Sequence, residues 1–171
     1  MELLIPGLIL VALMVYASTR IKKTAALAFE PESIETEKFV IEKPEGFLSV
    51  INGDPTLEFE AYSKEFGDEG SADIKQARIE IRLFAKSGLK DIVARIKGSA
   101  KVVSNISEVI SEKKYLLIEA ETSNKGIGML EFYKIAETGP DVVELRVIAL
   151  EETNPDIARK IETIVASFIV K

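Results

Sequence analysis

Residues 114–149, KYLLIEAETSNKGIGMLEFYKIAETGPDVVELRVIA, contain the pattern that decides the fold. Apolar and polar side chains alternate over three runs, as expected for strands with one buried face: 114–122, 128–135 and 142–149. The two segments between the runs have the composition of tight turns: 123–126 and 137–140. We therefore predict a meander of antiparallel hairpins as the centre of the domain.

Weaker patterns on both sides of the meander predict the other elements. Period-2 alternation or a short apolar run predicts further strands over 35–43, 47–51, 57–61 and 77–83. A helix is expected between Ser87 as its cap and Gly98 at its end, whereas residues 99–112 leave a further strand open. Asn154 and Pro155 supply the N-cap and first position of a closing helix. The predicted class is α+β, a twisted antiparallel sheet with its main helices packed across a face.

The N-terminal segment carries no charge from Leu3 to Thr19. As a helix it would be roughly 26 Å long, near the short end of what crosses a bilayer. A cleaved signal peptide is disfavoured because the basic residues follow the apolar run, and a buried core helix would show a polar stripe. We predict a single transmembrane helix in a lipid bilayer, with these residues at the membrane interface: Tyr16, Arg20, Lys22 and Lys23.

The same basic residues predict the orientation and the division of the chain. Positive charge after the apolar run favours a single-pass membrane protein whose domain lies in the cytoplasm, with a periplasmic or lumenal domain as the alternative. We divide the chain into an anchor with its basic flank (1–23), a tether (24–33) and a globular α+β domain (34–171).

The composition excludes several kinds of chemistry. The chain has no cysteine and no histidine, which removes disulfides, thiolate nucleophiles, Ser-His-Asp triads and the usual zinc ligands. Of 22 basic and 28 acidic residues, three and one respectively lie in residues 1–23, which leaves a net charge of −8 for residues 24–171. An acidic domain is repelled by phosphate backbones, so nucleic acid is excluded as the expected partner.

A resemblance to a known family rests on the element order and two short motifs. These are the turn Pro44-Glu45-Gly46-Phe47 and the helix end Ile164-Val165-Ala166-Ser167-Phe168-Ile169-Val170. Over residues 34–170 the chain resembles the Mog1/PsbP-like fold, a group that includes the PsbP proteins of the oxygen-evolving complex. The resemblance implies a non-enzymatic module that binds or stabilises a larger, often membrane-bound, assembly. PsbP proteins act on the lumenal side and often use histidine near metal, so no functional residue is carried over to this chain.

Two groups of side chains are candidates for a site. Four carboxylates on the predicted meander could bind a divalent ion or form an acid/base pair, although a solvated face with Lys134 and Arg146 as partners explains them as well: Glu119, Glu121, Glu131 and Glu144. Five side chains interrupt the charges on the presumed outer face and form a candidate partner surface, unless the protein's own second helix covers them: Tyr115, Leu117, Tyr133, Val142 and Ile148.

The sequence therefore predicts a binding protein without catalytic residues, cofactors or metal ligands. The first hypothesis is a non-catalytic, membrane-anchored accessory, assembly or scaffold subunit that binds other membrane protein subunits. The alternative is a membrane-tethered enzyme that works with carboxylates, or a sensor domain for a small molecule or metal.

Overall fold

The three alternating runs form long antiparallel strands in the computed structural model, which describes residues 11, 13–20 and 26–171. They are β7 (Lys113–Asn124), β8 (Ile127–Thr138) and β9 (Asp141–Leu150). Two tight turns join them, in which Gly126 and Gly139 take φ values of 84° and 60°, a region that favours glycine. The predicted meander of hairpins is confirmed.

The three strands of the meander belong to a seven-stranded antiparallel sheet within the described residues, with the order β3-β4-β5-β9-β8-β7-β6. Its other members are β3 (Phe47–Ser49), β4 (Phe59–Ser63), β5 (Ala77–Phe84) and β6 (Lys101–Ile110). A single turn of 3-10 helix, η1 (Glu69–Ser71), lies between β4 and β5. Strand β9 pairs with β8 on one side and with β5 on the other. The pairing with β5 joins the meander to β3, β4 and β5.

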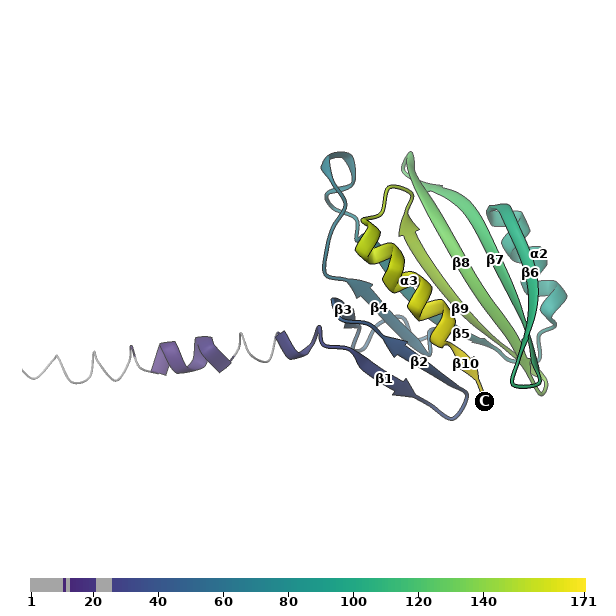
Figure 1. The fold of residues 1–171 in the computed structure, drawn as a ribbon, viewed down its shortest axis with the longest axis horizontal. Coiled ribbons are helices and arrows are strands. Elements are labelled where there is room, and N and C mark those ends of the chain that lie inside the picture. The colour runs from purple at the N-terminus through teal and green to yellow at the C-terminus, as the bar shows by residue number, and fades with distance from the viewer. Residues whose placement is uncertain (1–10, 12, 21–25) are drawn as a thin grey trace, which may run out of the picture.

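The two longer helices of the domain pack on opposite faces of this sheet (Figure 1). Helix α2 (Leu89–Ser99) buries Ile92 and Ile96 against the middle of β7 and β8. Helix α3 (Pro155–Ser167) buries Ile157, Ile161 and Ile164 against the other face. The apolar spacing of three and four residues in both helices produces these buried stripes.

A second, three-stranded sheet holds the two ends of the domain together. Its order is β1-β2-β10, from β1 (Glu32–Glu35), β2 (Phe39–Lys43) and β10 (Ile169–Val170). Phe39 packs against Phe168 with their ring centroids 6.0 Å apart. The backbone N–H of Val170 donates to the Tyr115 hydroxyl at 3.0 Å, so a side chain of the large sheet fixes the last strand.

Lys43 fixes the chain where it enters the domain. Its side chain is buried, and its Nζ donates to the carbonyl oxygens of Glu30 (2.6 Å), Phe47 (3.0 Å) and Ala28 (3.5 Å). The N–H of Gly46 also donates to the carbonyl of Phe29 at 2.8 Å. Residues 28–30 are therefore bound to Lys43 and to the turn after β2.

Several predicted details of the fold are wrong. The domain contains two sheets instead of one, and its helices cover opposite faces instead of one face. The predicted strand over 35–43 is a hairpin of β1 and β2, because Thr36 Oγ1 accepts from the N–H groups of Lys38 and Phe39 and closes a turn. Helix α2 has Gly88 as its N-cap without a side-chain hydrogen bond, and Gly98 lies inside it. The Asn154 cap is confirmed, with Oδ1 accepting from Asp156 N at 2.8 Å.

The predicted membrane-spanning helix over 3–19 is not supported. Within residues 11, 13–20 and 26–171, no helix is both long and apolar enough to cross a bilayer. Residues 3–10 and 12 of the predicted segment lie outside the described residues. The predicted location as a single-pass membrane protein is therefore not supported. Tyr16 is 63% exposed on this helix, Arg20 is its last described residue, and Lys22 and Lys23 lie outside the described residues.

Replacement of Lys43 by Met should destabilise the domain by about 1–3 kcal/mol, because three carbonyl oxygens lose their shared donor. Urea denaturation of the full chain measures the loss, and hydrogen exchange should rise first in residues 28–35. The exposed Lys90 on α2 provides the control Lys90→Met. Equal stability of the two variants would contradict the structural role of Lys43.

Candidate functional site

The five residues of the predicted partner surface do not lie on one face. Strand register places Tyr115 and Leu117 on the face that α3 covers, and Tyr133, Val142 and Ile148 on the face of α2. Tyr115 and Val142 are fully buried, and Tyr133 is almost fully buried. The protein's own helices cover most of this set, and only Leu117 belongs to the groove described below.

The four predicted carboxylates are also divided between the two faces. Glu119 pairs across the strands with Phe132, whereas Glu131 pairs with Ala120, so Glu119 and Glu131 point in opposite directions. Glu121 lies on the Glu119 face and forms an exposed ion pair with Lys101 at 2.8 Å. In the part of the chain that the structure describes, no three carboxylates come together as metal ligands.

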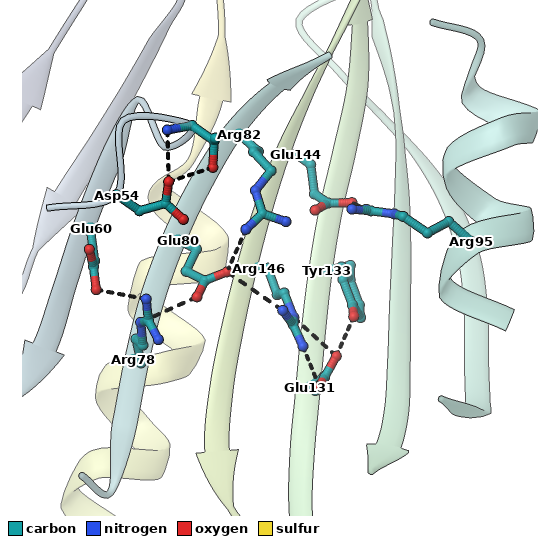
Figure 2. A network of polar contacts seen from close by, with 11 residues as sticks. Asp54, Glu60, Arg78, Glu80, Arg82, Arg95, Glu131, Tyr133, Glu144 and Arg146 are labelled. Atoms are coloured by element: carbon teal, nitrogen blue, oxygen red, sulfur yellow. Dashed lines mark hydrogen bonds and ion pairs between the residues drawn. The ribbon is translucent and has the colours of Figure 1, made fainter. Parts of the chain in front are cut away.

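Glu131 and Glu144 belong instead to a ladder of ion pairs on the α2 face of β4, β5, β9 and β8 (Figure 2). Arg146 contacts Glu131 with two hydrogen bonds, Nη2 to Oε1 at 2.6 Å and Nε to Oε2 at 3.1 Å. The Tyr133 hydroxyl donates to Glu131 Oε2, and Thr122 donates to Oε1 at 3.1 Å. Both oxygens of Glu131 are thus fully engaged.

Glu80 is the centre of the same ladder. Its carboxylate lies 3.2 Å from Arg78 and 3.6 Å from both Arg82 and Arg146. Arg78 continues the ladder to Glu60 at 2.8 Å. The carboxylates of Glu80 and Glu131 are buried, that of Glu60 is partly buried, and the guanidinium groups that pair with them are more exposed, so each charge has a partner. This arrangement stabilises the uncovered part of the face and offers no free acid or base.

The ladder shifts the pKa values of its carboxyl groups in opposite directions. Burial alone would raise the pKa of Glu131, but the hydrogen bonds from Arg146 and Tyr133 outweigh it and lower the pKa below the ordinary value. Burial raises the pKa of Glu144 above its ordinary value, although Arg95 on α2 forms an ion pair with it. The protein therefore keeps Glu131 ionised more strongly than Glu144.

The candidate site is a groove of about 480 Å³ on the opposite face, between α3 and the long strands. The register places Phe132 between the other two apolar residues of its floor, next to Leu130 along β8 and diagonal to Leu117 of β7, and all three are only partly buried. Ala158, Ile161 and Val165 of α3, together with Ala149 and Leu150 of β9, complete its apolar lining. We call this feature the α3 groove.

Lys134 lies in the α3 groove and is fully buried. Its Nζ donates to the carbonyl oxygen of Val165 at 3.0 Å and, more weakly, to that of Ala166 at 3.5 Å, and Glu108 lies 3.6 Å away. A cation at this place compensates the free carbonyl groups at the C-terminal end of α3. Burial lowers the pKa of Lys134, and Glu108 opposes this shift.

Sequence reasoning did not find the α3 groove. One strand contains Leu130, Phe132 and Lys134 at alternate positions, and the apolar stripe of the closing helix includes Ile161 and Val165. The strand side and the helix side of the groove could therefore each be recognised in the sequence, but not their position relative to each other. The missing information was that α3 packs against β2 of the small sheet and against β8 and β9 of the large one, and leaves the neighbouring part of the large sheet's face uncovered. This choice depends on tertiary packing, which no local pattern encodes.

No protein-family model matches the sequence, and a search of curated proteins finds no match either. Solved structures do resemble it. The cyanobacterial PsbP (CyanoP) from Synechocystis sp. PCC 6803 has a TM-score of 0.57 at 11% identity, over 84% of this chain and 94% of that one. LpqN of Mycobacterium tuberculosis, described as involved in cell envelope biogenesis, has a TM-score of 0.59 at 8% identity, over 83% and 91%.

The Ran-binding protein Mog1p of Saccharomyces cerevisiae has a TM-score of 0.52 at 12% identity, over 83% of this chain and 96% of that one. The chain has a Mog1/PsbP-like fold. The resemblance expected from the sequence is thus confirmed at the level of the fold, and these low identities show the fold alone.

Replacement of Glu131 by Gln should reduce the stability by about 2 kcal/mol near neutral pH, since a charged acceptor of several hydrogen bonds is lost. Because folding lowers the pKa of Glu131 below 4.5, its contribution is present above that pH and is lost as the pH falls through the folded-state pKa. The difference between wild type and variant should therefore shrink in acid.

Urea denaturation from pH 7 down to pH 3 tests this dependence. The exposed pair of Lys101 and Glu121 supplies the control Glu121→Gln, which should change stability little. A difference for Glu131→Gln that stays constant over the whole pH range would show that its carboxylate charge has no part in the effect.

Proposed function

We propose that this protein is a non-catalytic accessory module that binds a polypeptide segment of a partner protein in the α3 groove. The observation that carries the proposal is the uncovered apolar floor of Leu117, Leu130 and Phe132 beside α3. Partly exposed apolar side chains that gather in a hollow lose contact with water when a partner binds, which favours binding. Such a module would act as a subunit of a larger assembly.

The polar groups of the domain support binding over catalysis. The buried carboxylates of the ladder are engaged by arginine or tyrosine, as Glu131 is by Arg146 and Tyr133. The buried amine in the groove, Lys134, donates to carbonyl oxygens of α3. A general acid or base needs a group that is free to exchange a proton with the substrate, and these groups are bound to the protein itself.

The neighbours in fold give independent support for a binding role. The yeast neighbour is a Ran-binding protein, and the fold of this chain covers nearly all of its length. Folds of this kind carry different functions in different proteins, so the partner of this chain has to be inferred from its own groove.

A small apolar molecule is a second candidate for the groove. Its volume of about 480 Å³ lies within the range of small-molecule sites, roughly 300–1,000 Å³. The sensor hypothesis drawn from the sequence therefore retains one supporting observation. A polypeptide is favoured because the lining is elongated: it extends from Leu150 and Thr153 along α3 from Ala158 to Ala166.

Selection of displayed random peptides on the full chain tests the proposal. Ala158 is exposed on α3 and lines the groove, so Ala158→Trp should fill it without disturbing the core. Ala94 is equally exposed on α2, outside the groove, and Ala94→Trp is the matched control. We expect selected peptides to lose affinity by about tenfold or more with Ala158→Trp and to keep it with Ala94→Trp.

Two outcomes would contradict the proposal. Selected peptides whose affinity is the same for wild type and Ala158→Trp would place binding elsewhere on the surface. A selection that yields no binding peptide, together with a small apolar dye such as Nile red that wild type binds and Ala158→Trp does not, would favour the small-molecule function instead.

A further inference from the structure

Resting on the proposed function, we infer that the α3 groove selects an apolar polypeptide segment that is flanked by lysine or arginine. Four carboxylates line the groove beside its apolar floor, one each from β6, β7, the segment after β9 and α3: Glu108, Glu119, Glu151 and Glu162. They come from four parts of the chain, so the groove is acidic on several sides.

Three of these carboxylates have no cation of their own. Glu119, Glu151 and Glu162 are exposed and form no ion pair with any residue in the described ranges. The contrast with the ladder on the other face is clear, because every carboxylate there contacts an arginine. The negative potential of the rim is therefore not cancelled locally.

The cation in the groove does not offset this potential. Lys134 is the one basic residue among the described residues of the lining, and its side chain is only 1% exposed. Its donors face the carbonyl oxygens of Val165 and Ala166, and its nearest carboxylate is Glu108. The partial negative charge at the C-terminal end of α3 and the Glu108 carboxylate thus neutralise the charge of Lys134. An anionic ligand would meet an acidic rim without a free cation.

The length of the groove limits the length of the polypeptide segment that binds in it. Its lining on α3 runs from Ala158 to Ala166, a length of about 13 Å. An extended segment of about four residues, or a longer helical one, covers this distance. The central residues would contact Leu117, Leu130 and Phe132, and basic residues before or after them would reach the rim. Attraction between charges at an exposed rim weakens as salt is added.

The N-terminal segment of this chain itself has a related composition, with an uncharged run followed by Arg20, Lys22 and Lys23. Val11 and residues 13–16 are 58–63% exposed on their helix, so no described residue covers them. We assign the groove to a partner protein because these side chains are not seated in it. Occupation by the chain's own segment is an outcome that the experiment separates.

The test compares three labelled peptides that share one apolar core and differ only in their flanks, which are Lys-Lys, Gly-Gly or Glu-Glu. Fluorescence anisotropy with the full chain measures their affinities at low and at high salt. We expect the lysine-flanked peptide to bind about tenfold or more tightly than the glutamate-flanked one at low salt, with a smaller ratio at high salt.

Matched variants separate the local charge of the rim from the net charge of the protein. The rim variant carries Glu119→Gln, Glu151→Gln and Glu162→Gln, and should remove most of the preference for lysine. The control carries Glu37→Gln, Glu45→Gln and Glu137→Gln, three exposed positions outside the groove, and should keep the preference. Both variants change the net charge equally, and none of the six residues forms an ion pair within the described structure.

The outcomes distinguish this inference from the proposed function. Equal affinity for all three peptides, lost with Ala158→Trp, would overturn the charge preference and leave the binding function standing. Binding that is absent, or insensitive to Ala158→Trp, would overturn both. A substantial gain in peptide affinity when Leu13→Asp and Val15→Asp are introduced would show that the chain's own segment occupies the groove, which would overturn the assignment to a partner.

Discussion

The antiparallel pairing of β8 with β7 and β9 is the constraint on which the rest of the structure depends. From Met129 to Ala136, each residue of β8 has a strand neighbour on both sides. Successive side chains therefore point to opposite faces of the sheet and lie in two different environments. Phe132 and Lys134 face α3, whereas Glu131 and Tyr133 face the side of α2. A shift of one residue in this pairing would place the ion-pair ladder in the apolar core.

The two faces of the large sheet differ in the side chains that occupy the area left uncovered by the helix on each face. On the α2 side, the area that the helix leaves uncovered is closed by arginine over buried carboxylates, so it is complete without a partner. On the α3 side, the uncovered area keeps apolar side chains on its floor and unpaired carboxylates at its rim. The charges on the α2 face are thus paired within the domain. The uncovered area of the α3 face has the composition of an interface, with an apolar centre and a polar edge.

The long strands, the closing helix and the fold family could be predicted because each follows from a strong local pattern. The faces could not be assigned, because they depend on the turns. Asn124 pairs with Ile127 and Thr138 pairs with Asp141, so two-residue turns place odd positions of one strand beside even positions of the next. Tyr115 and Tyr133 therefore face opposite sides, and the predicted surface divides. The N-terminal prediction is not supported for another reason: the part of the chain that the structure describes contains no helix long and apolar enough to cross a bilayer, and residues 3–10 lie outside that part.

The fixed entry of the chain has a mechanical consequence. Lys43 binds residues 28–30 to the end of β2, and β2 lies between β1 and β10 in the small sheet. The last strand is in turn bonded to Tyr115 of the large sheet. A pulling force on the chain ahead of the domain is thus transmitted through the Lys43 contacts into the strand that pairs with the other terminus. Both terminal strands of the domain, β1 and β10, therefore bear such a force through β2. Separation of one of them from β2 would weaken the pairing of the other.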